Sequence, residues 1–419
     1  MNHLKTILYC TAYIGLYSLS GCTSEASQQK NMYEISGSLN KDMQNVVRSN
    51  TAFAFDMYHQ MLKRNKNLFF SPFSISEAMA MTYVGAGGET KIQMGRVLHF
   101  QVSDQHLKYG FKRLDEHLKS FNTQKGYTFK TANAIWPEKS FKIKKSFSRD
   151  VEKYFASESI AMDYTHNANE AKNSINHWVA KQTNKRILNI IPAIDPSTKI
   201  ILTNATYFKA KWLNAFNEKH TDKKPFHLRD ATEIDVDMMH LSAHLNYAED
   251  SDYQAVVLPY STKSTSMVII LPKKGKYDRV VKKLGSNTLE NIKQKVNTKY
   301  KVKLSLPKFK MTTETMDLVA YFKRLGMKNA FSDRADFSAI SNDKGLEITQ
   351  ILHKAFIEVS EESTEAAAST VVMVGVTSVG PHMPPAPKVK VLDVNRPFIV
   401  IIKDEETGQI LFMGNITNP

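Results

Sequence analysis

The order of its hydrophobic patterns is the feature that most constrains the fold of this 419-residue chain. Helical periodicity dominates the first part of the sequence, and strand patterns dominate the remainder. The helical segments are 51–64, 71–86, 108–121 and 146–155, and the strand segments are 199–212, 253–260, 265–272, 301–310, 353–360 and 396–404. No repeat or low-complexity linker interrupts residues 46–419. Helices gathered mostly before strands predict an α+β fold, and the lack of a boundary predicts a single domain.

The N-terminal residues predict export and anchoring. Residues 1–21 contain an early cation, Lys5, and an apolar run too short to span a membrane, which indicates a secretory signal. The letters LSGC, ending at Cys22, resemble the bacterial lipoprotein cleavage box, in which the cysteine is lipidated and becomes the new N-terminus; an ordinary signal peptide is the alternative. We expect a lipid on Cys22, a flexible tether over residues 22–45, and an outer-membrane lipoprotein of the cell envelope.

The sequence holds none of the common catalytic or cofactor motifs. GxSxG, HExxH, GxxxxGK[ST] and CxxC are absent, and histidines and carboxylates are scattered without ligand spacing. The glycine-rich stretch GAGGET at residues 85–90 lacks dinucleotide spacing and is typical of a turn that ends a helix. We therefore expect no cofactor, no metal and no enzymatic activity. The net charge of +15 is compatible with a polyanion partner or with a well-solvated basic surface.

The segment 357–391 begins and ends like a strand, but its middle is rich in small residues and its second half in prolines. Side chains alternate between the two faces of a strand. One face of this segment would be uncharged and small or β-branched, and consists of Thr364, Ala366, Ala368, Thr370, Val372 and Val374. The other face carries the only charge, and consists of Glu365, Ala367, Ser369, Val371, Met373 and Gly375. A simple linker predicts no such segregation.

Several segments together resemble the serpin family of protease inhibitors, in family order from about residue 46 to the end. They are NLFFSPFSIS (67–76), YVGAGGET (83–90), LTNATYFKAKW (202–212), LPY (258–260), LPKFK (306–310), AFSDRADFS (330–338), ILHKAFIEVSEESTEAAAS (351–369) and RPFIVIIKDEETGQILFMGNITNP (396–419). The resemblance implies a domain of three β-sheets and about nine helices over residues 46–419, with an exposed reactive-centre loop at about 361–390.

The resemblance also implies a mechanism of inhibition. A protease attacks the loop and forms its acyl-enzyme, and the loop then inserts as an extra strand into the central sheet, a switching mode known for serpins. Roughly fourteen inserted residues at about 3.3 Å each would displace the protease by about 46 Å. Misplacing its nucleophile stops deacylation. We expect a suicide-substrate inhibitor of serine proteases, and of papain-like cysteine proteases, which also form acyl-enzymes.

Family motifs assign residues to the opening of the central sheet. The shutter, where the central strands part beneath the loop, would be Ser71, Ser74, Asn204 and His353. The breach, where the loop first enters, would be Trp212, Lys308 and Glu361. The hinge would be Glu361, Glu362, Ser363, Thr364, Glu365, Ala366, Ala367, Ala368 and Ser369. We expect His353 to be a buried structural histidine at a moving seam, and Lys308 to pair with Glu361, although exposed ion pairs contribute only about 0–1 kcal/mol.

The sequence departs from the family pattern in two places. Ser363 stands before the hinge threonine, where the family usually has glycine, and serine restricts φ more than glycine does. A long segment follows the expected reactive bond, and its four prolines favour an extended stalk without strand pairing. Family spacing from Glu361 places the reactive bond between Thr377 and Ser378. The neighbouring candidates are Val374, Gly375 and Val376, whose shapes favour elastase-like or subtilisin-like proteases with shallow apolar pockets.

Two alternatives remain open. A non-inhibitory carrier serpin is expected to place charged, bulky or proline residues on the inserting face, and this sequence does not. A polyanion-binding surface would use the helix that binds heparin in some relatives, with His106, Lys108, Lys112, Arg113 and Lys119 as candidates. Asp115 and Glu116 interrupt that run. The expected partners are target proteases and, through Cys22, a membrane, and we expect a monomer.

Overall fold

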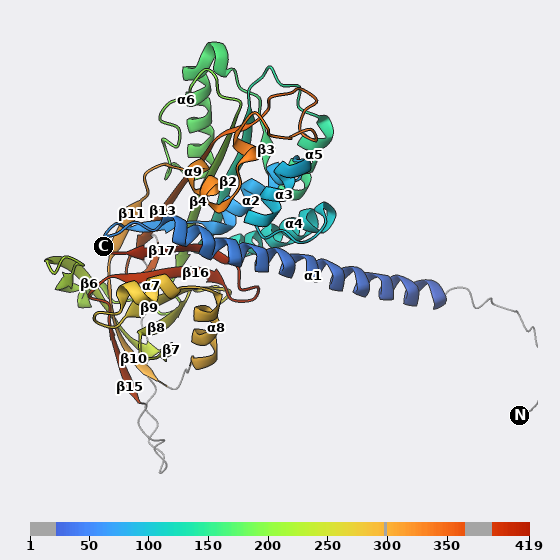
Figure 1. Cartoon of the computed structure of the whole chain (residues 1–419). Helices are drawn as coiled ribbons and strands as arrows, with labels where there is room; N and C mark the ends of the chain where they lie inside the picture. The colour runs from blue at the N-terminus through green and yellow to red at the C-terminus, as the bar shows by residue number, and fades with distance from the viewer. Residues whose placement is uncertain (1–21, 297–299, 365–387) are drawn as a thin grey trace, which may run out of the picture.

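The computed structural model of the chain describes residues 22–296, 300–364 and 388–419, with side chains from residue 40 onward. Nine α-helices lie within these residues (Figure 1). They are α1 (Cys22–Met61), α2 (Pro72–Tyr83), α3 (Gly88–Val97), α4 (Asp104–Ser120), α5 (Lys145–Phe155), α6 (Tyr164–Gln182), α7 (Tyr277–Lys283), α8 (Ser286–Lys295) and α9 (Val319–Leu325). Three short 3₁₀ helices are Phe121–Thr123, Glu218–His220 and Asn329–Phe331.

The described strands form three sheets. A six-stranded sheet has the order β1 (Leu68–Phe70), β17 (Ile410–Ile416), β16 (Phe398–Asp404), β9 (Thr265–Pro272), β8 (Tyr253–Pro259) and β7 (Asn246–Glu249). A four-stranded sheet has the order β15 (Val389–Asp393), β10 (Lys301–Pro307), β6 (Glu233–His244) and β5 (Asp222–His227). The last prolines of the expected stalk, Pro384 to Pro387, lie outside the described residues, but the strand directly after them pairs with β10. The expectation that this segment makes no strand pairing is therefore wrong for residues 389–393.

The third sheet has seven strands and carries the candidate site. Its order is β11 (Phe309–Thr312), β13 (Ile348–Val359), β14 (Ser363–Thr364), β4 (Ile200–Lys211), β2 (Tyr127–Pro137) and β3 (Glu158–Ser159), with β12 (Met316–Asp317) paired to β13. Three sheets and nine helices confirm the expected α+β fold. The strands β2 and β6 and the helix α6 were not among the elements expected from the sequence, although residues 233–238 alternate and apolar residues in α6 recur at helical spacing.

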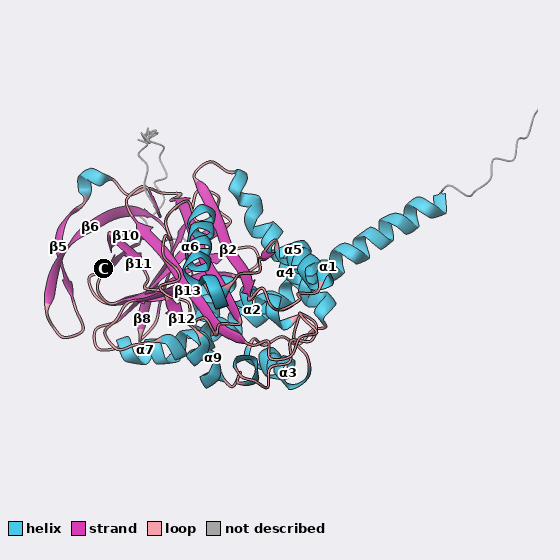
Figure 2. Ribbon diagram, turned by 90° about the horizontal axis from the view of Figure 1, so that it is seen from above, coloured by secondary structure: helices cyan, strands magenta, loops and turns pink. Residues whose placement is uncertain are grey.

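The first helix differs from expectation. Residues 22–45, expected to be a flexible tether, are helical and continuous with the packed residues that end at Met61. Figures 1 and 2 show the N-terminal half of α1 projecting away from the rest of the chain. Adding one residue to an existing helix costs much less than starting a new one, because each added residue also adds a hydrogen bond. The packed half of α1 therefore supplies the nucleus from which the polar half can continue.

Two hydrophobic cores enclose the seven-stranded sheet. The main core lies on its inner face, between this sheet, the other two sheets and most of the helices. A second core lies on its outer face, where α6 covers β2, β4 and β13 (Figure 2). Along β4, Leu202 and Phe208 face the main core, whereas Ile201 and Tyr207 face the second core. Both faces of the central strands are thus largely buried, so a strand that joins this sheet needs mostly small or apolar side chains.

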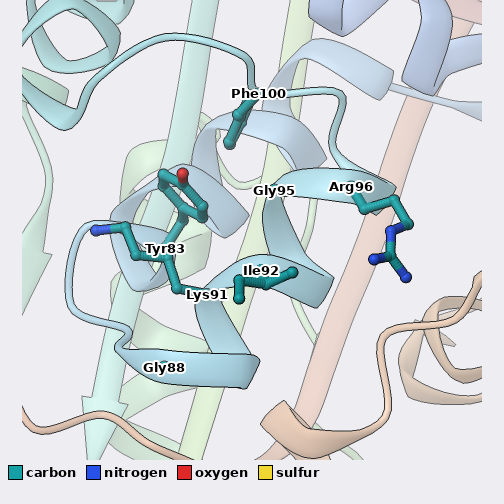
Figure 3. A pocket seen from close by; sticks show the side chains of 7 residues that line it. All are labelled: Tyr83, Gly88, Lys91, Ile92, Gly95, Arg96 and Phe100. Atoms are coloured by element: carbon teal, nitrogen blue, oxygen red, sulfur yellow. The ribbon is translucent and has the colours of Figure 1, made fainter.

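The glycine-rich stretch 85–90 forms the end of the connection from α2 to α3 and the first three residues of α3. A Cβ atom on Gly85 would lie 2.3 Å from a side-chain carbon of Ile340, so the glycine allows close packing here. Beside this connection, an open pocket of about 330 Å³ is lined by Tyr83, Gly88, Lys91, Ile92, Gly95, Arg96 and Phe100 (Figure 3). None of these residues belongs to the site described below. No helix of the described residues is both long and apolar enough to cross a membrane.

Candidate functional site

The candidate site lies where β13 and β4 separate. The two strands pair in parallel up to Ala355 and Thr206. Beyond this point β14 lies between them, antiparallel to both, with Thr364 opposite Val359 on one side and Ala210 on the other. The first residues after the breach are therefore already hydrogen-bonded within the sheet, and the seam below them is closed.

Thr364 packs into the main core at the point where β13 and β4 separate. Its side chain is buried, and its hydroxyl lies 2.8 Å from the hydroxyl of Tyr260. Burial raises the pKa of Tyr260 far above its ordinary value, so the phenol is neutral. Ser363, which replaces the usual glycine, is also buried and does not have a positive φ. In this conformation serine is accommodated without the backbone strain that would require glycine.

Glu361 fixes the turn that precedes β14. Its carboxylate, almost fully buried, lies 2.9 Å from Lys308 Nζ and accepts a hydrogen bond of 2.9 Å from the Thr221 hydroxyl. Its backbone oxygen accepts a hydrogen bond from the backbone N–H of Phe216. Burial acts to raise the pKa of Glu361, but the hydrogen bonds from Lys308 and other donors outweigh it and hold that pKa below its ordinary value. The carboxylate is therefore ionised at neutral pH and anchors the turn.

Trp212 closes the other side of the same turn. Its backbone N–H donates to the Glu362 carbonyl, and its indole N–H donates to the Ser360 carbonyl at 2.9 Å. The indole ring stacks on Tyr260, with ring centres 4.7 Å apart. The three residues expected at the breach thus meet around residues 360–362, with Lys308 and Trp212 on opposite sides. Tyr260, which ends the family motif LPY, and Thr221 are additional members that were not assigned to the breach from the sequence.

The four expected shutter residues form one buried hydrogen-bond network. The backbone N–H of Ser71 donates to Nε2 of His353 at 3.2 Å. Since Nε2 accepts, the proton of the imidazole lies on Nδ1, which donates to Oδ1 of Asn204 across the seam. The Asn204 amide in turn donates to the hydroxyl of Ser74. Burial lowers the pKa of His353 to about 3, so the ring stays neutral and keeps this tautomer.

The network continues to two residues that sequence reasoning missed. The Asn204 amide donates to Oδ1 of Asn133 on β2 at 2.6 Å, and the Asn133 amide donates to Oε2 of Glu77 on α2 at 2.6 Å. The other carboxyl oxygen of Glu77 is buried and has no hydrogen-bond partner among the described residues. A single acid within the otherwise uncharged helix 72–83 is the signal in the sequence that could have drawn attention to Glu77.

The environment of Glu77 favours its neutral form. Burial raises the pKa of Glu77 to about 8, and the nearby carboxylate of Asp115 acts in the same direction. Lys119 and the hydrogen bond from Asn133 oppose this shift but do not cancel it. The pKa of Asp115 is also raised, mainly by burial. A protonatable group therefore terminates a chain of hydrogen bonds that crosses the seam between β4 and β13.

Other expected site residues lie elsewhere. Residues 365–369 of the hinge and residues 374–378 around the reactive bond lie outside the described residues. The five cations proposed for polyanion binding lie on α4, and each has a carboxylate within 4 Å. The contacts are His106 to Asp42, Lys108 to Asp150, Lys112 and Arg113 to Glu116, and Lys119 to Asp115. This helix therefore offers polyanions no cation without a partner, and the polyanion site stays a prediction without structural support.

The arrangement of the site suits a conformational change rather than catalysis. Among the described residues, no group of three or more histidines, cysteines or carboxylates is arranged to hold a metal. What the residues do form is a strand end held between two strands, a buried anchor before it and a polar network across the seam beneath it. Such an arrangement can admit a further strand between β13 and β4, as in strand addition to a sheet.

Comparison with known proteins identifies the family. The sequence model described as "Serpin (serine protease inhibitor)" matches residues 48–419. The chain belongs to the serpin family. It is 40% identical over 376 residues to an uncharacterized serpin-like protein of Thermococcus kodakarensis, covering 89% of this chain and 86% of the relative. It is 33% identical over 389 residues to leukocyte elastase inhibitor of Bos taurus, covering 90% of this chain and all of the relative.

The solved structure of human thyroxine-binding globulin in complex with thyroxine is similar as well. It shares 30% identity and a TM-score of 0.79 with this serpin, covering 91% of this chain and 99% of that chain. Members of the serpin family are usually protease inhibitors and generally not enzymes. Because similar proteins include both an elastase inhibitor and a thyroxine-binding globulin, family membership alone does not decide the function of a particular serpin. That function has to be argued from its own hinge and loop.

The protonation of Glu77 predicts a pH dependence of stability. Its native pKa of about 8 exceeds the ordinary 4.5, so the native serpin binds this proton more tightly than the unfolded chain does. The contribution of this proton to the free energy of unfolding is complete below pH 4.5. It is lost as the pH rises toward 8, by at most about 1.4 kcal/mol per pH unit. We expect Glu77→Gln, which mimics the neutral acid, to reduce this loss.

The measurement is the urea midpoint of native-state unfolding between pH 5 and pH 8.5. Glu89→Gln, on the exposed first turn of α3, is the matched control and should keep the wild-type slope. Equal pH slopes for wild type and Glu77→Gln would show that Glu77 is ionised in the native state.

Proposed function

We propose that this serpin is a suicide-substrate inhibitor of serine proteases, and of papain-like cysteine proteases, which likewise form acyl-enzymes. The single observation that carries the proposal is the position of β14, whose two residues lie between β13 and β4 in a defined register. A cleaved loop can extend β14 only along the line between these strands. The register therefore predicts the partner of every residue that would follow.

Continuing the antiparallel pairing of Thr364 with Ala210 brings Ala366 opposite Phe208 and Thr370 opposite Asn204. Continuing the pairing of Thr364 with Val359 brings Thr370 opposite His353. His353 and Asn204 are already opposite each other across the closed seam. Both registers thus lead Thr370 to the same place, where its insertion must break the hydrogen bond from His353 to Asn204.

The register also predicts which side chains would face the main core. Thr364 contacts Tyr260 in that core, and strand residues two apart share a face. Ala366, Ala368, Thr370, Val372 and Val374 would therefore face inward, and all are uncharged. Glu365 would lie opposite Lys209 on the other face. A carrier that never inserts its loop needs no such segregation, so this pattern favours inhibition.

The end of β4 limits the paired strand. Because β4 starts at Ile200, the register would pair loop residues as far as Val374, three residues before Thr377. Insertion over this length would carry a protease attached at Thr377 along the whole sheet. The closed seam between β13 and β4 would supply the free-energy barrier that keeps the intact loop from inserting. Cleavage would remove the covalent connection that restrains the other end of the loop.

The target class follows from the side chains around the proposed bond between Thr377 and Ser378. Valine, glycine and threonine precede that bond, without lysine, arginine or an aromatic residue near it. Shallow apolar primary pockets, as in elastase-like and subtilisin-like proteases, suit these side chains, whereas a deep acidic pocket does not. We further propose that Cys22 is lipidated and that the serpin is held at the outer membrane, because LSGC follows an exported-type N-terminus.

Ala366→Glu should convert the inhibitor into a substrate. Insertion would bury an unpaired charge beside Phe208, which slows insertion relative to deacylation. We expect cleavage to continue while the denaturant-resistant complex with the protease disappears on a denaturing gel. Glu365→Gln, on the opposite face beside Lys209, is the control and should keep the complex. Undiminished complex formation by Ala366→Glu would show that this residue does not face the core.

Trapping should be strongest for proteases that cleave at Thr377. We expect elastase-like and subtilisin-like enzymes to form stable complexes at bonds between about Val374 and Val379, with efficiency falling away from Thr377. The masses of the C-terminal fragments released from purified complexes measure the bond attacked. Stable trapping of trypsin-like enzymes alone, or at a bond beyond Pro381, would mean that the reactive bond lies elsewhere.

Cys22→Ala should release the serpin from membranes without altering inhibition, because α1 projects from the body that holds the hinge. Membrane fractionation of expressing cells and inhibition assays on the soluble variant measure the two effects. Ser20→Ala, which keeps the cysteine, should remain attached. Membrane attachment of Cys22→Ala would contradict lipidation of this residue.

A further inference from the structure

The four-stranded sheet exposes an unusual pair of side chains at its edge. Val389 and Val391 on β15 are 51% and 60% exposed, and they are two of the five strongly exposed large hydrophobic residues in the described part of the chain. The parallel register places Val389 beside Lys301 and Val391 beside Lys303 on β10. Residues at paired positions share a face. These four side chains form a surface that we name the loop-foot face, and the exposed Lys388 directly precedes it in the chain.

The cations of the loop-foot face and the preceding Lys388 lack partners. Lys301, Lys303 and Lys388 are exposed, and within the described ranges none of their side chains makes an ion pair or hydrogen bond. This contrasts with α4, where each candidate cation has a carboxylate within 4 Å. The nearest acid along the same strand face, Asp393, accepts a hydrogen bond from Asn395 and lies beside Arg396. Exposed His244 lies opposite Lys301 on β6.

The loop-foot face lies close in sequence to the proposed reactive bond. Lys388 is the first described residue after the loop, and it lies ten residues after Ser378. Ten residues span at most about 36 Å even when fully extended. A protease domain of about 230 residues has a radius of gyration of about 17 Å, so an enzyme attached to the loop is within reach of the loop-foot face.

We propose that the loop-foot face is an accessory contact surface for the target protease, and that it selects enzymes with acidic residues and an apolar spot beside the active-site cleft. The inference rests on the proposed inhibitory function and narrows its target class. Unpaired lysines accelerate encounter with an acidic surface in a salt-dependent manner. The two valines add short-range contact once water is displaced, since exposed apolar side chains next to charge are typical of interaction sites.

The test compares association rates at low and high salt. The probes are a recombinant subtilisin-like protease with acidic residues beside its cleft, and a variant of that protease in which these carboxylates are replaced by their amides. The serpin variant is Lys301→Glu/Lys303→Glu. Its matched control is Lys282→Glu/Lys283→Glu on α7, which makes the same change in net charge at two exposed sites separated from β10 in both views (Figures 1 and 2).

We expect the second-order rate constant of wild type with the acidic protease to fall at least fivefold between 50 and 300 mM NaCl. Lys301→Glu/Lys303→Glu should lose at least tenfold at 50 mM and most of the salt dependence, while the stoichiometry of inhibition stays unchanged because the hinge is intact. The α7 control and the amidated protease should show little of this effect. Val389→Thr/Val391→Thr should slow association equally at both salt concentrations.

Three outcomes would overturn the inference. Equal losses in both lysine variants would assign the effect to net charge rather than to this face. Unchanged rates for Lys301→Glu/Lys303→Glu, together with loss of its retention on a heparin column, would make the face a polyanion site. Wild-type rates that do not distinguish the acidic protease from its amidated variant would exclude charge selection. Failure to trap any protease would instead refute the proposed function, which the stoichiometry reports separately.

Discussion

The closed seam between β13 and β4 is the constraint on which the rest of this structure depends. Two adjacent parallel strands, each buried on both faces, are joined below the hinge by backbone hydrogen bonds and by the contact of His353 with Asn204. As long as this contact holds, a strand that extends β14 cannot reach the level of Thr370. Every other feature of the site either holds the hinge at the upper end of the seam or supports the polar network within it.

Polar groups suit this seam because their contacts are directional and their loss is costly. A buried amide or imidazole without a partner costs about 1–3 kcal/mol, so the seam cannot open partway without penalty. A new strand whose threonine reaches the same level can supply new partners, and the penalty is then removed. The unpaired oxygen of Glu77 is the weakest point of the network, since a half-satisfied polar group gains little from its burial. The network thus opposes opening of the seam, although one of its oxygens, on Glu77, has no hydrogen-bond partner among the described residues.

The sequence allowed much of this arrangement to be predicted, because several of its signals are local. The apolar and β-branched residues of 199–212 predict β4, and the family motifs predict that Ser71, Asn204 and His353 meet. Asn133 and Glu77 were missed because their roles arise from contacts with residues more than fifty positions away. The pairing of α4 cations with Asp42 and Asp150 was missed because these carboxylates are also distant in the sequence, 64 positions from His106 and 42 positions from Lys108. The helical backbone of residues 22–45 was missed because the prediction of a tether used only the polar composition of this segment. Composition does not show that the segment continues a helix packed further along the chain.

The turn between β13 and β14 has a consequence for how this chain can vary in length. Only the residues 360–363 separate Val359 from its partner Thr364, and Glu361 and Trp212 fix that turn from both sides. A strand alternates with a period of two, so one residue added or removed here would turn every following side chain to the opposite face. Glu365 would then point into the main core. The turn therefore tolerates no change by an odd number of residues, whereas residues 388–419, beyond the reactive bond, add no strand to the seven-stranded sheet.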